Sequence, residues 1–243
     1  SIRQRPMKPL FDALEKLGAK IETSNGRCPF NIHGPIHGGK TEIDAVSSQF
    51  LTALLFCCPL AEGNTEINVL RLNEKPYVDI TLDWLKFMNI EIKNENYKYF
   101  YIKGNQRYNS FEREIPADFS TATFHACAAA ITGSEILLKG LDFNDHQGDK
   151  AVFKYLENMG TEIIHTSEGV IVKGNKLRGI DIDMNDTPDA LPAMAVTACF
   201  ADGVTRLLNV PQARLKECDR ISACAKELRK MGAEIEELED DLI

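Results

Sequence analysis

One short run of the sequence combines the residue types needed for acid–base chemistry on a charged ligand. Five consecutive positions carry two cations and two carboxylates, Lys216, Glu217, Asp219 and Arg220. Lysine can serve as a proton donor or point charge, and arginine can bind a carboxylate or phosphate through two parallel hydrogen bonds. Lys216 and Arg220 are four residues apart, so they would share a face if this run were helical. The alternative is a set of exposed surface ion pairs, which contribute little to stability.

Polar residues that are typical of helix starts precede three apolar segments. They are Ser47-Ser48-Gln49, Asp118-Phe119-Ser120-Thr121 and Asp186-Thr187-Pro188-Asp189. Helix capping alone explains such residues. The N–H groups at a helix start also favour anions, and the first of these starts adds two hydroxyls and an amide without a carboxylate. We therefore regard Ser47, Ser48 and Gln49 as a candidate phosphate site and Asp189 as a candidate base.

A repeat of about 70 residues predicts the elements that position these groups. The pattern Leu-x-x-Met-Gly-x-x-Ile at 228–235 recurs, with variations, at 14–21, 85–92 and 156–163. Apolar helices are expected at Ser48–Ala61, Thr121–Ile131 and Ala190–Ala201, each followed by a Gly stop. A helix and two strands are expected at Thr81–Lys103 and at Asp149–Lys173. The result is an α/β (α+β) fold of roughly three β-α-β-α-β-β units.

The phase of this repeat predicts that the sequence is part of a longer protein. The helix expected at Arg5–Leu17 corresponds to the second helix of a unit, and residue 243 follows soon after another such helix. Repeat proteins usually have atypical units at their ends. The sequence instead begins and ends inside a unit.

Composition excludes several classes of function. The 243 residues carry a net charge of −8, which opposes binding to nucleic acid and to anionic membranes. The longest apolar run, Phe50–Ala61, is too short to cross a bilayer. Seven cysteines without a C-x-x-C pair indicate reduced thiols and a cytoplasmic protein. The five histidines lack metal-binding spacing, so no metal is expected.

Residues 34–41, GPIHGGKT, match the phosphate-loop pattern of nucleotide-binding proteins. That loop requires a helix directly after its Lys-Thr pair. The residues that follow, Glu42-Ile43-Asp44-Ala45-Val46, alternate as a strand does. We therefore expect a loop between two strands here, and no nucleotide site.

Taken together, these motifs resemble the 5-enolpyruvylshikimate-3-phosphate synthase (EPSP synthase) family. The resemblance rests on Arg5-Pro6 with LEKLGA, SSQFL at 47–51, KPYVDIT at 75–81, DTPDA at 186–190 and KECDR at 216–220 followed by ELRKMGA. It covers all 243 residues but only the middle part of the family's chain. It implies a two-domain, inside-out α/β barrel that is incomplete here. Residues 1–116 would be part of the first domain and residues 117–243 part of the second.

The resemblance implies transfer of the enolpyruvyl group of phosphoenolpyruvate to the 5-hydroxyl of shikimate 3-phosphate. Phosphate is released, no cofactor is needed, and the reaction belongs to the shikimate pathway to aromatic amino acids. A monomer is implied for the full-length protein. The implied substrate-binding residues are Arg5, Ser47, Ser48, Gln49, Tyr77, Gln212 and Arg220. Asp189 would take the proton of the attacking hydroxyl, while Lys216 and Glu217 would transfer protons at the enolpyruvyl carbon.

The sequence departs from the family pattern in three respects. Glu74 stands where the family usually has a small hydroxyl residue, and Gln212 where it has Asn. A carboxylate facing a phosphate is unfavourable, so we expect Glu74 to point away or to weaken that contact. The family's basic ligands near both chain ends have no counterpart in these residues. We therefore expect no turnover by this chain alone.

Two other functions are consistent with parts of the sequence. UDP-N-acetylglucosamine enolpyruvyl transferase has a similar fold but needs a reactive cysteine on a mobile loop, whereas Cys57 and Cys58 lie in an apolar helix. A non-catalytic repeat protein could bind a partner through a concave face. This second alternative predicts no small anionic ligand, and no loss of binding on changing Ser47 or Lys216.

Overall fold

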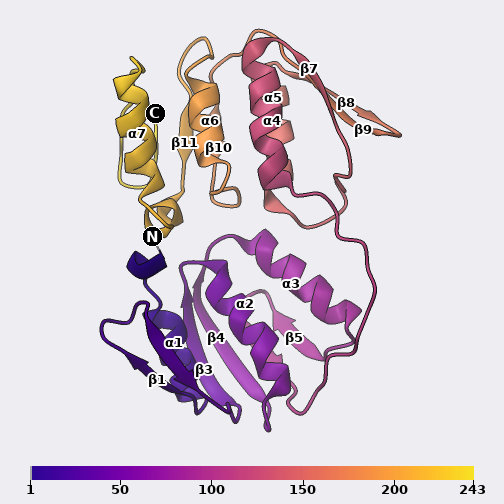
Figure 1. Ribbon diagram of the computed structural model, residues 1–243, viewed down its shortest axis with the longest axis vertical. Helices are drawn as coiled ribbons and strands as arrows, with labels where there is room; N and C mark the ends of the chain where they lie inside the picture. The colour runs from indigo at the N-terminus through magenta and orange to yellow at the C-terminus, as the bar shows by residue number, and fades with distance from the viewer. Residues whose placement is uncertain (1) are drawn as a thin grey trace. The chain divides into compact units, whose positions relative to one another are not determined.

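Strands and helices alternate along the chain in the computed structural model, which describes residues 2–243. The chain folds into two units, unit 1 (Ser1–Glu112) and unit 2 (Arg113–Ile243). Both units mix helices with sheets, which confirms the predicted α/β class (Figure 1). The predicted domain boundary at residue 117 lies near the division between these units and stays a prediction. Among residues 2–243, no helix is long and apolar enough to cross a membrane.

Unit 1 contains one complete set of elements in the predicted β-α-β-α-β-β order, from β3 to β6. With η for a short 3-10 helix, its elements are η1 (Ile2–Gln4), α1 (Lys8–Lys16), β1 (Lys20–Thr23), β2 (Phe30–His33), β3 (Gly39–Ala45), α2 (Ser48–Cys57), η2 (Cys58–Leu60), β4 (Thr65–Leu72), α3 (Lys75–Phe87), β5 (Ile92–Glu95) and β6 (Tyr99–Ile102). Strands β1 and β2 form an antiparallel pair. The main sheet has the order β3-β4-β6-β5, in which only β3 and β4 are parallel.

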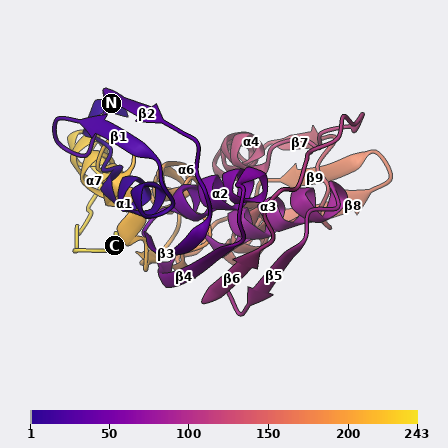
Figure 2. The same ribbon diagram turned by 90° about the horizontal axis from the view of Figure 1, so that it is seen from below.

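Helix α2 is the crossover that the parallel β3–β4 pair requires. Its sequence, SQFLTALLFC, buries Leu51, Leu54 and Leu55 completely. Alternate side chains of strand β3, including Ile43 and Ala45, point into the same core. Figure 2 shows α2 and α3 on one face of the main sheet. The burial of these side chains fixes the positions at which α2 and α3 begin.

The phosphate-loop pattern does not form a nucleotide site. Residues 34–38 have no regular structure, and β3 begins at Gly39, so a strand follows Lys40-Thr41 in place of the required helix. This confirms the prediction of a loop between two strands.

Unit 2 has the same alternation but no strand ahead of its first helix. Its elements are α4 (Phe119–Thr132), β7 (Glu135–Leu138), η3 (Gly148–Lys150), α5 (Ala151–Met159), β8 (Glu162–Thr166), β9 (Gly169–Lys173), β10 (Asp181–Asp183), α6 (Leu191–Ala198), β11 (Arg206–Leu208), η4 (Pro211–Leu215) and α7 (Arg220–Lys230). The strand expected before α4 is absent from the described chain. The segment at 111–116 is exposed, carries charges and ends at Pro116, which cannot donate to a ladder.

The sheets of unit 2 pack around α4 and α6. Strands β7, β9 and β8 form an antiparallel sheet in that order, and β10 pairs with β11 in parallel. Phe119 meets Phe143 and Phe153 edge-on, at ring-centroid distances of 4.9 and 5.7 Å. Small residues on α4, including Ala126, let α6 pack closely through Met194. This packing fixes the residues that lead into α6.

Several helix boundaries differ from the predictions by a few residues, and two of these are the start of α3 and the end of α6. Helix α3 begins at Lys75, ahead of the predicted Thr81, because Pro76 suits the first helical turn. Glu74, the residue before the helix, has a non-helical φ of 57°. Helix α6 ends at Ala198, before the predicted Ala201. The first difference matters for function, since it places Glu74 directly at a helix start.

Candidate functional site

The start of α2 presents the three residues predicted to bind phosphate. Ser47 is the N-cap residue with an extended backbone, yet within residues 2–243 its side chain makes no capping hydrogen bond. Ser48 is the first helical residue and is buried, whereas Gln49 is exposed. Helix capping is the simpler explanation for this motif, but the Ser47 side chain does not cap α2.

Both polar hydrogens of Ser48 are donated to a buried carboxylate. The Ser48 N–H and O–H contact Glu74 Oε2 at 3.2 and 2.8 Å. Glu74 and Ser48 are each only 2% exposed. Glu74 immediately precedes α3 in a left-handed conformation that residues other than Gly rarely adopt. Of the two expectations for Glu74, that it points away or that it weakens the phosphate contact, the first is wrong at this motif, because its carboxylate lies against Ser48, and the second stays a prediction.

Neighbouring hydrogen bonds hold the starts of α2 and α3 together. The Asn73 side-chain amide donates to the Val46 carbonyl at 3.2 Å, and its backbone N–H donates to the Ala45 carbonyl at 3.2 Å. One turn further along, the hydroxyls of Thr52 and Thr81 lie 3.2 Å apart. These bonds join residues far apart in sequence, so they give the Ser48–Glu74 contact a rigid setting.

The remaining predicted residues of unit 1 lie in two other segments. Tyr77 is in the first turn of α3, partly buried, and its N–H donates to the Glu74 carbonyl at 3.1 Å. Tyr77 is thus linked to the α2 start through Glu74, whose carboxylate contacts Ser48. Arg5 is partly buried in the bend between η1 and α1. It comes from a separate part of unit 1.

A cluster of opposite charges surrounds Asp189 in unit 2, just ahead of α6. The Asp189 Oδ1 atom lies 2.5 Å from Arg220 Nη1 and 3.8 Å from Lys216 Nζ. Arg220 Nη1 also donates to the Pro188 carbonyl at 3.2 Å. The side chains of Lys216 and Arg220 are 9% and 16% exposed. The structure thus brings Asp189, Lys216 and Arg220 together, and their role in acid–base chemistry stays a prediction.

Glu217 completes this cluster through a two-point contact with Arg220. The Arg220 Nε and Nη2 atoms donate to the two Glu217 carboxylate oxygens at 3.0 and 3.1 Å. Burial disfavours the charge of the guanidinium, but Asp189 and then Glu217 outweigh it and raise the pKa of Arg220. Arg220 is therefore cationic at every working pH.

The run 216–220 is not one helix, so the condition under which Lys216 and Arg220 would share a helical face is not met. Lys216 follows η4 with an extended backbone, and α7 begins only at Arg220. Asp219 caps this helix by accepting the Ser222 N–H at 3.0 Å, and a cap cannot itself lie inside the helix. Lys216 and Arg220 nevertheless meet at Asp189.

Gln212, predicted to bind substrate, is buried and supports the loop ahead of Asp189. Its amide nitrogen donates to the Asn185 carbonyl at 2.7 Å. Its Oε1 atom is buried and has no hydrogen-bond partner among residues 2–243. A substrate contact through Gln212 would use this oxygen or the second hydrogen of its amide nitrogen.

Arg214 braces the segment between η4 and α7 against the last residues of the chain. Its Nη1 atom lies 2.7 Å from Asp219 Oδ2 and 3.1 Å from Glu237 Oε1. Its Nε and Nη2 atoms donate to the carbonyls of Glu239 and Leu238 at 2.6 and 2.5 Å. Arg214 thereby fixes Asp219, the residue that determines where α7 begins.

The start of α4 resembles that of α2 in one contact and differs in another. The Ser120 hydroxyl donates to the buried carboxylate of Asp149, as Ser48 does to Glu74. Here, however, Asp118 caps the helix by accepting the N–H groups of Ser120 and Thr121 at 3.2 and 2.8 Å. The Phe119 N–H donates to Gln147 Oε1 at 2.8 Å as well, so all three N–H groups of this first turn are engaged, and the α4 start is not a candidate anion site.

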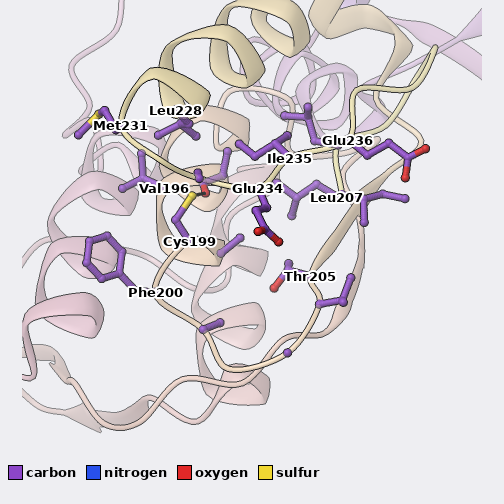
Figure 3. Close-up of a pocket in the computed structure, with 18 of the residues that line it drawn as sticks. Val196, Cys199, Phe200, Thr205, Leu207, Leu228, Met231, Glu234, Ile235 and Glu236 are labelled. Atoms are coloured by element: carbon purple, nitrogen blue, oxygen red, sulfur yellow. Dashed lines mark hydrogen bonds between the residues drawn. The ribbon is translucent and has the colours of Figure 1, made fainter.

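A groove in unit 2 and a cysteine in unit 1 do not offer groups suited to the predicted acid–base chemistry. A groove of about 850 Å³ runs between α6 and α7 (Figure 3), and its labelled walls include Val196, Leu207 and Leu228. None of the predicted site residues lines it.

Cys58 in unit 1 is fully buried, and a hydrogen bond from Cys57 raises its pKa, which makes its thiol a poor nucleophile. Within the described residues, no group of three or more His, Cys, Asp or Glu side chains could hold a metal ion.

Sequence reasoning identified Glu74 only as a departure and missed Asp149 altogether. Neither contact could be read from sequence spacing, since each joins the starts of two successive helices. The one available signal was a carboxylate next to the KPYVDIT motif.

Comparison with known proteins yields a consistent set of relatives. Residues 1–243 match the family model described as EPSP synthase (3-phosphoshikimate 1-carboxyvinyltransferase). The whole chain is 54% identical to the 3-phosphoshikimate 1-carboxyvinyltransferase of Acetivibrio thermocellus and 51% identical to that of Ruminiclostridium cellulolyticum. The relative from Methanocaldococcus jannaschii is 42% identical. The chain spans 58% of the length of each of these three relatives.

A solved structure gives the same result for the fold. The chain aligns over its full length with an EPSP synthase from Acinetobacter baumannii, at a TM-score of 0.76 and 26% sequence identity. It covers 57% of that chain.

Proposed function

The chain belongs to the EPSP synthase family, and from this we propose that it supplies part of an enolpyruvyl transferase. The reaction moves the enolpyruvyl group of phosphoenolpyruvate to the 5-hydroxyl of shikimate 3-phosphate and releases phosphate. The observation that carries the proposal is the cluster of Asp189, Lys216 and Arg220, in which a carboxylate and two sheltered cations meet. General acid–base catalysis needs such groups within reach of one another.

In the proposed reaction, each step includes the transfer of one proton to or from a substrate. Protonation of the methylene carbon of phosphoenolpyruvate makes its C2 atom electrophilic, and Lys216 or Glu217 supplies this proton. The 5-hydroxyl adds to C2 as Asp189 takes the hydroxyl proton. Loss of a proton from the former methylene carbon and departure of phosphate then restore the double bond. Lys216 and Arg220 offset the negative charge that Asp189 and the reacting groups bring together.

We assign substrate binding to residues of both units. In unit 1, Ser47, Ser48, Gln49 and Tyr77 would bind the phosphate and ring of shikimate 3-phosphate. Gln212 would contact the same substrate through its carbonyl oxygen. Phosphoenolpyruvate would meet Arg5, Gln49 and Arg220. Arg220 already binds two carboxylates, so its contact with a further anion requires one of them to move or share the guanidinium.

Further assignments accompany this proposal. The recurring element order reflects internal duplication, and residues 1–116 and 117–243 are parts of two domains. The reaction uses no cofactor. The protein acts in the cytoplasm, and its full-length form is a monomer. Each of these statements is supported by the family resemblance and the sequence pattern.

Calorimetric titration of shikimate 3-phosphate into the chain tests the proposed binding site. We expect saturable binding that weakens about tenfold in Ser47→Ala, since one hydrogen bond to a charged group is lost. Thr121→Ala is the matched control, because it removes a hydroxyl from the equivalent start of α4. Equal binding by the chain and its Ser47→Ala variant would contradict the assignment. Binding of UDP-N-acetylglucosamine instead would favour the related transferase.

Turnover tests whether these residues suffice for catalysis. With both substrates present, we expect no phosphate release above background, because the family's basic ligands near the chain ends have no counterpart here. A colorimetric phosphate assay measures this directly. Steady release that depends on both substrates would show that the chain is sufficient.

A further inference from the structure

Glu74 occupies donors on which the proposed phosphate site depends. Ser48 has one backbone N–H and one hydroxyl hydrogen, and both point at Glu74 Oε2. A phosphate that enters this site finds both donors already engaged. It is left with the Ser47 hydroxyl, the Gln49 side chain and the Gln49 N–H, because the Phe50 N–H donates to the Ser47 carbonyl at 3.2 Å.

The Glu74 carboxylate is held in place by its surroundings. It is 2% exposed, and its backbone adopts a left-handed φ of 57° directly ahead of α3. The Asn73 contacts with Ala45 and Val46 fix the same segment against the start of α2. A solvent-exposed glutamate could turn away from an incoming anion at little cost, but this one has to break packed contacts to do so.

We propose that Glu74 sets the affinity of the α2 start for the phosphate group of shikimate 3-phosphate. It lowers this affinity in two ways: it withholds the two Ser48 donors, and its negative charge opposes that of the phosphate. Glu74 is thus a positioning residue that acts through Ser48. The inference rests on the proposed function, which places the phosphate at Ser47, Ser48 and Gln49.

A contact in unit 2 shows the alternative role for Glu74, which is to stabilise the packing of two helices. The Ser120 hydroxyl donates to the buried Asp149 in the same manner, at a helix start to which no ligand is assigned. A serine–carboxylate contact between two helix starts can therefore serve packing alone. If Glu74 has only that role, its replacement changes stability and leaves phosphate affinity where it was.

The decisive variant is Glu74→Gln, which removes the charge and keeps an acceptor oxygen of similar shape for Ser48. We expect shikimate 3-phosphate to bind about tenfold more tightly to this variant, as measured by calorimetry. Asp149→Asn is the matched control, because it makes the same change at the equivalent contact of unit 2, and it should leave the affinity unchanged. Circular dichroism and thermal unfolding establish that both variants are folded.

A second variant, Glu74→Ser, releases the Ser48 donors as well as removing the charge. We expect it to bind at least as tightly as Glu74→Gln. Adding Ser48→Ala should then weaken binding more in the Glu74→Ser background than in the unmodified chain, where the Ser48 hydroxyl is engaged by Glu74. This non-additive result would not follow from a purely structural role.

The outcomes separate the two hypotheses. Unchanged or weaker binding by both Glu74 variants, with weaker binding by Ser47→Ala, would overturn the role of Glu74 and leave the proposed function intact. No effect of Ser47→Ala, or no binding by any variant, would overturn the proposed site and this inference with it.

Discussion

The start of α2 in unit 1 and the start of α6 in unit 2 handle a carboxylate in opposite ways. In unit 1, Glu74 is approached by the neutral N–H and O–H groups of Ser48. In unit 2, Asp189 is approached by two cations, Lys216 and Arg220. Each contact joins the start of one helix to the segment that begins the next. The same place in the element order therefore supports different chemistry, according to what the second helix brings to it.

The two arrangements also differ in charge balance. Around Asp189, two carboxylates face two cations, since Glu217 joins the cluster. Glu74 accepts two hydrogen bonds from Ser48 at the α2 start, where the helix adds partial positive charge. A cluster in which two carboxylates share one sheltered guanidinium tolerates the loss of that guanidinium poorly, whereas a carboxylate held by neutral donors loses a smaller contribution when one donor is removed.

The largest expected effect is on stability, when Arg220 is replaced by Met. This change leaves Asp189 and Glu217 without their shared guanidinium, and we expect unit 2 to lose about 3 kcal/mol. Amide hydrogen exchange of α6 and α7, followed in increasing urea, measures the loss within that unit. Arg206→Met is the control, because the exposed Arg206–Asp181 pair should contribute less than about 1 kcal/mol. Similar losses for both variants would remove the distinction between a sheltered cluster and a surface pair.

An intermediate effect is expected for Ser48→Ala. The variant leaves the buried Glu74 carboxylate without one hydrogen bond, so we expect unit 1 to lose about 1 to 2 kcal/mol. Ser120→Ala makes the equivalent change in unit 2 and should cost a similar amount there. Urea unfolding, probed by hydrogen exchange in each unit, compares the two. A loss near 3 kcal/mol for Ser48→Ala would mean that neutral donors matter as much to Glu74 as cations do to Asp189.

The smallest effect concerns a second carboxylate of unit 1 that also meets a neutral donor. The Tyr97 hydroxyl donates to Asp79 at 2.6 Å, and this hydrogen bond raises the pKa of Tyr97 to about 12. A raised folded-state pKa means that the contact stabilises unit 1 fully below pH of about 10 and that this stabilisation is lost as the pH rises toward 12.

Carbon-13 NMR of the tyrosine rings can follow this titration. Asp79→Asn should lower the pKa of Tyr97 toward its ordinary value. Tyr108, whose pKa burial raises to about 12, is the internal control and should titrate as before. If the Tyr97 titration stays in place in Asp79→Asn, the hydrogen bond is not the cause of the raised pKa.

Much of the fold follows from the order of apolar runs and glycine stops. The periodic sequence predicted α2, α4 and α6 close to their observed positions, because burying Leu51 or Met194 requires a helical spacing. The strand before α4 was predicted by analogy with the other units. It is missing because Pro116 and its charged neighbours suit an exposed segment.

The site was predictable by residue type but not by contact. Capping preference and charge type identified Ser47, Asp189 and Arg220 from the sequence alone. The approach of Glu74 to Ser48 depends on how α2 packs against α3, and nothing in the spacing of 26 residues encodes it. In the same way, the spacing of Lys216 and Arg220 did not show that this run is non-helical, because Asp219 serves better as a cap than as a helical residue.

Arg214 joins parts of unit 2 that would otherwise open separately. It contacts Asp219 at the start of α7 and, at the same time, the carbonyls of Leu238 and Glu239. Residues 236 and 243 pair with each other through two backbone hydrogen bonds. Opening of this final hairpin therefore removes a brace from the cap of α7, and the amides of both should exchange as one cooperative unit. The order of the Asp189 cluster is thus tied, through one guanidinium, to the opening of residues 236–243.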